Sequence, residues 1–198
     1  MKKTHFLKLI AILCLVISFS LISTYTRADA ATQKVSQELI QTCSSSLVSL
    51  GILKGDEKGN LKLNDKITRC EFVALVNRTM GFENTTNVEN INLPFKDIKK
   101  NHWAYNTLKV ALKHELINGY PDNTVRPDAT VNFAEANAIL IRALGYNKTL
   151  TGSWPDNVLK KSKELSISKG LDLDRYKELT RGEASVLIYN SLTVDIKK

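Results

Sequence analysis

The stretch Ile67-Thr68-Arg69-Cys70-Glu71 returns twice further along the chain, each time directly before an apolar run with helical spacing. The other two copies are Val131-Asn132-Phe133-Ala134-Glu135 and Leu179-Thr180-Arg181-Gly182-Glu183. In such a capping box the Thr or Asn side chain accepts a hydrogen bond from the backbone N–H three residues on, and the Glu carboxylate accepts one from the N–H of the Thr or Asn. The pattern predicts three helices that begin in the same way, with the capping pairs Thr68 and Glu71, Asn132 and Glu135, and Thr180 and Glu183.

An arginine occupies the first helical position in two of the copies, Arg69 and Arg181, whereas the second copy has Phe133 there. A cation beside the positive end of a helix dipole costs roughly a few tenths of a kcal/mol. We therefore expect an anionic partner beside each arginine. A neighbouring carboxylate of the protein would meet this need as a ligand would, and the sequence leaves both possibilities open.

The spacing of glycines indicates that the capping boxes belong to longer repeats. Gly55 and Gly119 each precede the capping glutamate of their repeat by 16 residues, whereas Gly170 precedes its glutamate by only 13. Polar turn residues follow each glycine, and a segment with helical apolar spacing comes before it. Each helix-loop-helix unit is too small to bury its own apolar faces, so we expect the repeats to pack on one another.

Residues 1–30 have the pattern of a secretory signal peptide, with lysines near the start, an apolar run from Leu9 to Leu21, and the A-x-A cleavage motif Ala28-Asp29-Ala30. We expect cleavage after Ala30 and secretion of the remainder. The apolar run is short for a membrane span, which needs roughly 20 residues. The expected organisation is a signal peptide over 1–30, an N-terminally incomplete repeat over 31–86, a second repeat over 87–147 and a third repeat with a shortened loop over 148–198.

Charge and cysteine content narrow the possible functions. Removal of residues 1–30 lowers the formal net charge from +8 to +5, and no basic run is present, so nothing indicates nucleic-acid binding. Cys43 and Cys70 both lie on apolar helical positions, where we expect buried free thiols and not a disulfide. Neither has the Cys or His neighbours of a metal site.

The second repeat carries further motifs that resemble a known family. They are Phe95-x-Asp97-Ile98, His102-Trp103-Ala104 and Gly119-Tyr120-Pro121-Asp122-Asn123-Thr124-x-Arg126-Pro127, to which the third repeat adds Trp154-Pro155-Asp156-Asn157. Together with the two Thr-Arg-x-Glu motifs, this pattern is similar to the S-layer homology (SLH) domain, three copies of which usually occur in tandem. The resemblance extends over nearly all of residues 31–198.

The resemblance implies both a fold and a function. The fold would be all-α, a pseudo-threefold spindle of three prongs around a central three-helix bundle. The function would be non-catalytic anchoring to the cell wall of mainly Gram-positive bacteria. The grooves between repeats would bind secondary cell-wall polysaccharide that carries a pyruvate ketal on an amino sugar. No cofactor or metal is implied.

Arg69 and Arg181 correspond to the motif arginine, and the resemblance implies that they receive the pyruvate carboxylate. A guanidinium beside free N–H groups at a helix N-terminus would suit such an anion. Because Phe133 replaces the arginine in the second repeat, we expect one or two working grooves and not three.

Aromatic and acidic residues of the motifs are further ligand-binding candidates. Trp103 and Trp154 could stack on sugar faces, or they could fill the core at the base of a prong, and the sequence favours neither. Asp97 and Asp156 are expected to cap the helices that follow them, although either could accept a sugar hydroxyl.

The turn residues Gly119 and Tyr120 are expected to shape the loop beside a ligand, since glycine permits close backbone approach. A tight turn alone would also explain the glycine.

The sequence bears on two other functional classes, enzymes and protein-binding scaffolds. Catalysis is disfavoured because the three motif glutamates already have capping roles, and no nucleophile motif accompanies His102 or His114. The remaining alternative is a secreted scaffold or S-layer assembly accessory that contacts an unidentified surface protein. Such a scaffold would act independently of the wall polymer.

Overall fold

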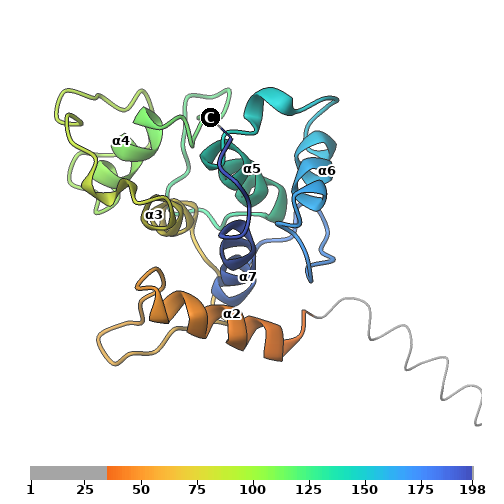
Figure 1. The fold of residues 1–198 in the computed structure, drawn as a ribbon. Helices are drawn as coiled ribbons and strands as arrows, with labels where there is room; N and C mark the ends of the chain where they lie inside the picture. Colours follow the sequence, from red (N-terminus) through yellow and green to blue (C-terminus); the bar gives the residue numbers. More distant parts are fainter. Residues whose placement is uncertain (1–34, 198) are drawn as a thin grey trace, which may run out of the picture. The chain divides into compact units, whose positions relative to one another are not determined.

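The computed structural model describes residues 35–197, so the expected signal peptide and its cleavage site lie outside the described residues. The described residues form six α-helices, which Figure 1 labels: α2 (Gln37–Ser49), α3 (Arg69–Thr79), α4 (Tyr105–Lys113), α5 (Phe133–Ala143), α6 (Asp156–Glu164) and α7 (Arg181–Ser191). Two short 3-10 helices follow α3 and α5, η1 (Phe82–Asn84) and η2 (Asn147–Thr149). The described part of the chain has isolated β-bridges but no strand, which confirms the all-α prediction. Within 35–197, no helix combines the length and apolar character needed to cross a membrane.

All three capping boxes are present. The side chains of Thr68, Asn132 and Thr180 each accept a hydrogen bond from the N–H of the glutamate three residues on, and each glutamate carboxylate accepts one from the N-cap N–H. The helices α3 and α5 end shortly before Gly81 and Gly145, whose positive φ angles of 70° and 81° suit glycine. Local sequence signals therefore set both ends of these helices.

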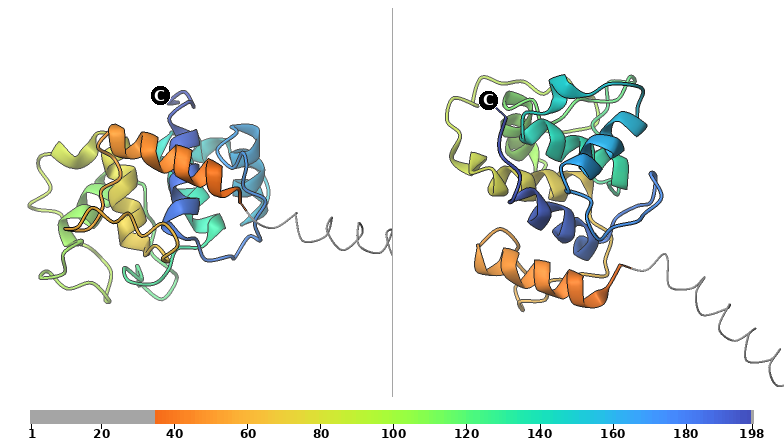
Figure 2. Two further views of the ribbon diagram at one scale, coloured as in Figure 1. Left: turned by 90° about the horizontal axis from the view of Figure 1, so that it is seen from below. Right: turned by 45° about the vertical axis from the view of Figure 1, so that its right-hand side comes forward.

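The helices α3, α5 and α7 form the centre, and each contacts the other two. Each is also covered by an outer helix: α4 packs on α3, α6 on α5 and α2 on α7 (Figures 1 and 2). The outer helix thus packs mainly on the central helix of a neighbouring unit and not on the one that follows it in its own unit. The α2–α7 pairing joins the first and last helices of the described chain.

A ring of backbone hydrogen bonds links the segments that lead into the central helices. The N–H of Ile67 donates to the carbonyl of Leu179 (3.1 Å), Leu179 donates to Val131 (3.0 Å), and Val131 donates back to Ile67 (3.1 Å). All three side chains are fully buried. The ring fixes the starting points of α3, α5 and α7 relative to one another, in an environment without water to compete for the bonds.

The first N–H groups of each central helix are also occupied. In every case they donate to carbonyls of a loop that leads into another central helix. The bonds run from Arg69 to Ala129 and Cys70 to Pro127, from Phe133 to Lys177 and Ala134 to Arg175, and from Arg181 to Asp65 and Gly182 to Leu63, at 2.8–3.0 Å. The expectation of free N–H groups beside Arg69 and Arg181 is therefore wrong, because neighbouring loops already use them.

The two cysteines of the described region are buried free thiols, as predicted. Cys43 lies on α2 and Cys70 on α3, and burial raises the pKa of both thiols. Both side chains act as small apolar core residues.

The N-cap of α7, Thr180, allows the contribution of a capping box to the stability of the protein to be tested. We expect Thr180→Ala to lower the free energy of unfolding by about 1 kcal/mol, because the N–H of Glu183 loses its acceptor. Urea denaturation followed by circular dichroism measures the change. Thr86→Ala, at an exposed loop residue, is the matched control and should change stability by less than about 0.5 kcal/mol. Equal effects of the two substitutions would contradict a capping role.

Candidate functional site

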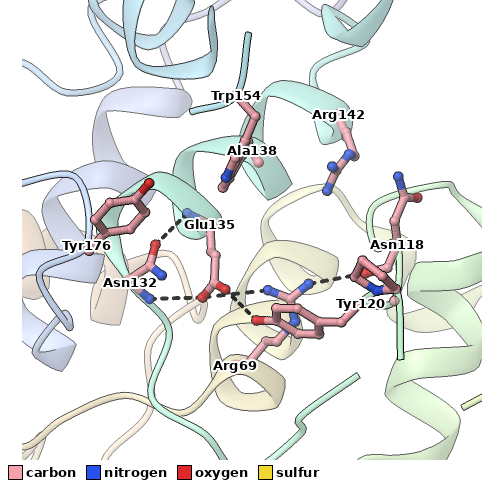
Figure 3. A pocket seen from close by; sticks show the side chains of 11 residues that line it. Arg69, Asn118, Tyr120, Asn132, Glu135, Ala138, Arg142, Trp154 and Tyr176 are labelled. Atoms are coloured by element: carbon pink, nitrogen blue, oxygen red, sulfur yellow. Dashed lines mark hydrogen bonds and ion pairs between the residues drawn. The ribbon is translucent and has the colours of Figure 1, made fainter. Parts of the chain in front are cut away.

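A pocket of about 260 Å³ opens between α3 and α5 (Figure 3). Its walls come from the start of α3, the loop after α4, the inner face of α5, and the segments before α6 and α7. The lining residues are Arg69, Asn118, Gly119, Tyr120, Pro121, Asn132, Glu135, Ala138, Arg142, Trp154 and Tyr176. The pocket therefore brings together four of the sequence-predicted ligand-binding candidates, from segments far apart in the chain.

Arg69 is the central cation of this pocket and is only 6% exposed. Its guanidinium donates to the carbonyl of Asn118 at 3.4 Å and lies 3.9 Å from the carboxylate of Glu135. Its Nε has no hydrogen-bond partner. A buried guanidinium normally needs close, well-aligned acceptors to offset the loss of water. The contacts that the protein gives Arg69 are long and incomplete.

Tyr120 and Glu135 form the polar floor beside Arg69. The Tyr120 hydroxyl donates to the Glu135 carboxylate, which also accepts the N–H of Asn132 at 3.2 Å. Burial, together with the hydrogen bond to Glu135, raises the pKa of Tyr120 to about 12. The guanidinium of Arg126 lies 3.9 Å from the centre of the Tyr120 ring, on which it can stack. Glu135 is thus committed to its neighbours.

Position 119 requires glycine because the backbone there packs closely against the Phe95 side chain and the Thr124 carbonyl. A Cβ at this position would lie 2.4 Å from the Phe95 ring and 3.0 Å from the carbonyl oxygen of Thr124. Any larger residue would push the loop away from Phe95 and so displace Tyr120.

The two tryptophans occupy different pockets. Trp154, just before α6, is 50% exposed and lines the Arg69 pocket. Trp103, just before α4, is 60% exposed and lines a separate pocket between α3 and α4 together with Asn77 and Arg78. The alternative that these residues fill the core is therefore wrong for both. Trp154 is placed where a sugar ring in the Arg69 pocket could stack on it.

Asp97 and Asp156 do not cap helices, contrary to prediction. The N-cap residues of α4 and α6 are Ala104 and Pro155, and neither helix has a side-chain cap. Asp97 instead accepts the N–H groups of two residues in the 122–127 loop, at 2.8 and 2.7 Å, and so holds that loop in place. Asp156 is the first residue of α6 and pairs with Arg175 at 2.8 Å. Neither aspartate lines the Arg69 pocket.

The Arg181 groove repeats the Arg69 arrangement with different neighbours. Arg181 lies 3.8 Å from the carboxylate of Glu71, as Arg69 lies near Glu135. It donates to the carbonyls of Leu61 at 3.0 Å and Lys54 at 3.3 Å. A pocket of about 380 Å³ adjoins it and is lined largely by charged residues. Both arginines thus have the neighbouring carboxylate that the sequence left open as an alternative to a ligand, although at long range.

The third groove has lost the arginine but not the carboxylate. Phe133 is buried at the first position of α5, and Glu183 of α7 pairs instead with Lys177 from the loop before α7. The capping box of Asn132 is intact. The helix start is thus preserved with Phe133 in place of an arginine, and Lys177 pairs with the buried glutamate.

Among the pocket residues with polar side chains, sequence reasoning missed three. Arg142 lines the Arg69 pocket, although it belongs to none of the motifs. It lies 64 residues after Arg78, which indicates an equivalent position in the repeat. The sequence does not indicate that the two arginines line different pockets. Asn118 directly precedes the predicted Gly119, whereas Tyr176 lies in a loop without any motif.

These features define a class of all-α protein. It is built on three helices that begin with the same capping box and has charged pockets between them. Residues 94–136 of the chain match the S-layer homology domain family. The matched segment includes α4, the Gly119 loop and the start of α5.

Named relatives are similar to the chain over a longer stretch than this match. The chain is 32% identical over 150 residues to the middle cell wall protein of Brevibacillus brevis, covering 76% of this chain and 14% of that protein. It is 31% identical over 150 residues to the surface layer protein of Brevibacillus choshinensis, covering 76% and 13%. It is 27% identical over 156 residues to the cellulosome-anchoring protein of Acetivibrio thermocellus, covering 71% and 35%. The chain therefore corresponds to a small part of each of these longer relatives.

The raised pKa of Tyr120 predicts a specific alkaline instability. The folded protein holds the phenolic proton up to about pH 12, whereas an unfolded chain releases it near the ordinary value of 10.0. The contribution of Tyr120 to stability is therefore complete below about pH 10 and is lost as the pH rises towards 12. Tyr120→Phe should remove this part of the decline, as measured by urea unfolding from about pH 9 to 12. Tyr176→Phe, at an exposed site, is the control, and an unchanged pH profile for Tyr120→Phe would refute the assignment.

Proposed function

We propose that this chain is a non-catalytic module that anchors protein to the bacterial cell wall by binding an anionic, pyruvylated secondary cell-wall polysaccharide. Three SLH repeats, over 31–86, 87–147 and 148–198, form the module, and the secreted protein is held at the cell surface. The family match and relatives named for the cell wall, the surface layer and cellulosome anchoring support the anchoring role.

The observation that carries the proposal is the incomplete pairing of Arg69 in its pocket. A ligand carboxylate at about 2.7–2.9 Å from the guanidinium would supply the strong acceptor that the Asn118 carbonyl and Glu135 do not. Recognition depends on the side chain alone, because the helix N–H groups are bonded to loop carbonyls. Trp154 offers an exposed indole for the sugar ring that carries the carboxylate.

Catalysis has no support in the arrangement of the carboxylates. The carboxylate of each motif glutamate, Glu71, Glu135 and Glu183, accepts a hydrogen bond from the N–H of its own N-cap residue. A general acid or base must exchange a proton with the substrate, which these committed groups do not favour. Neither a cofactor nor a nucleic acid is part of the proposal.

Sedimentation with purified cell walls separates anchoring from the scaffold alternative. We expect the protein to pellet with intact walls and to stay in the supernatant once hydrofluoric acid has removed the secondary polymer. Equal pelleting with intact and stripped walls would refute polysaccharide anchoring and would favour a partner other than the polymer.

Single and double substitutions locate the carboxylate receptors. Arg69→Ala should weaken wall binding by about 10- to 100-fold, because a charge-assisted hydrogen bond contributes roughly 1.5–3 kcal/mol. Arg181→Ala should weaken it less, since Arg181 already has a closer carbonyl acceptor at 3.0 Å. Unchanged binding by a folded double variant, as judged by circular dichroism, would exclude the receptor role.

Tryptophan fluorescence reports which aromatic residue meets the ligand. The chain has only two tryptophans. Addition of solubilised wall polysaccharide should change the emission of the protein and of Trp103→Phe, whereas Trp154→Phe should lose the response of the Arg69 pocket. A response that persists in Trp154→Phe and disappears in Trp103→Phe would place the sugar between α3 and α4 instead.

A further inference from the structure

Ten residues after the N-cap of each central helix stands a side chain that donates a hydrogen bond to a backbone carbonyl. The carbonyl belongs to the segment that follows the outer helix of the same repeat. Arg78 donates to the carbonyl of Ile52, Arg142 to that of Leu116 at 3.4 Å, and Asn190 to that of Ile167 at 2.9 Å. The asparagine shows that this bond needs only a neutral amide. The charge of the two arginines therefore calls for a separate explanation.

The two arginines differ in how their charge is neutralised. The Nε of Arg78 forms a 3.0 Å ion pair with Glu83 in η1. The residue 64 positions after Glu83 is Asn147 in η2, which carries no charge. Within residues 35–197, Arg142 has no ion pair, and its one hydrogen bond is long. Arg142 is thus a cation whose charge its own repeat leaves unbalanced.

Arg142 extends from α5 into the Arg69 pocket, where its guanidinium lies above Tyr120 and beside Asn118 (Figure 3). Burial and the charge of Arg69 lower the pKa of Arg142, which is the effect of a second cation in a partly desolvated space. The charged residues lining the pocket are Arg69, Arg142 and Glu135. Because two guanidinium groups face a single carboxylate, the pocket has an excess of positive charge.

We propose that Arg142 is a second anion-binding residue of this pocket, and that Arg69 and Arg142 together hold one acidic group of the ligand from two sides. This inference rests on the proposed function and specifies it: the ligand must present a carboxylate or similar anion, because a neutral sugar would leave the two guanidinium groups with only the distant Glu135 carboxylate as a counter-charge. In the Arg181 groove the counterpart of Arg142 is Arg78, which is paired with Glu83 and lines the Trp103 pocket instead, and the other cations that line the groove are lysines.

Arg142→Gln and Arg78→Gln are the matched variants for a test, because glutamine keeps an amide donor for the carbonyl of Leu116 or Ile52 and removes the charge. Arg78→Gln also removes the ion pair with Glu83, which lies outside the Arg69 pocket. The full chain and both variants would be titrated calorimetrically with the methyl glycoside of an N-acetylhexosamine carrying a pyruvate ketal, and with its uncharged methyl ester. Arg69→Ala and Arg142→Lys complete the set. Thermal unfolding of each variant shows that it is folded.

We expect Arg142→Gln to weaken binding of the acid by about tenfold or more, since it loses a charge-assisted contact, and Arg78→Gln to change it by less than about twofold. Arg142→Lys should be intermediate, because lysine keeps the charge but not the planar fork. The methyl ester should bind all variants equally weakly.

Two results would overturn the inference while leaving the proposed function intact. One is loss of binding in Arg69→Ala with wild-type affinity in Arg142→Gln. The other is an equal loss in Arg142→Gln and Arg78→Gln, which would indicate a structural effect of the position. Failure of the unaltered protein to bind both the acid and intact walls would instead overturn the proposed function, and with it this inference.

Discussion

The buried ring of hydrogen bonds among Ile67, Val131 and Leu179 is the constraint on which the rest of the molecule depends. Each of these residues directly precedes the N-cap of a central helix. The ring therefore sets where α3, α5 and α7 begin, and the first N–H groups of each helix extend the same bonding to a neighbouring loop. Buried backbone groups must be paired, so any displacement of one helix start would leave donors unsatisfied in all three segments. The grooves inherit their geometry from this junction.

The position of the arginines follows from that arrangement. A residue at the first position of one central helix lies near the capping glutamate of the next, which gives the pairs Arg69 with Glu135 and Arg181 with Glu71. Where Phe133 interrupts the series, Lys177 takes over the glutamate from a different part of the backbone. The capping glutamate is thus present in all three grooves of this chain. The cation paired with it, and how tightly the protein binds that cation, differ from groove to groove.

Local signals made much of the fold predictable, and non-local contacts explain what was not. Capping boxes and terminal glycines act within a few residues, so helix starts and stops could be derived from sequence. The partner of each outer helix could not, because apolar spacing reveals a buried face but not what covers it. Asp97 illustrates the same limit, since its carboxylate serves N–H groups 28 and 29 residues away and not the nearby helix. Arg142 and Arg78 hold matching positions in their repeats. Only the structure shows that Arg78 forms an ion pair with Glu83.

The pairing of α2 with α7 has a consequence for the order in which the molecule can assemble. The buried face of α2, with Ile40, Cys43 and Leu47, finds its main partner in the last helix of the described chain. Contacts between residues so far apart in sequence form late and slow the folding reaction, because the whole intervening loop must first close. A growing chain therefore carries its first helix unpaired until α7 has been made.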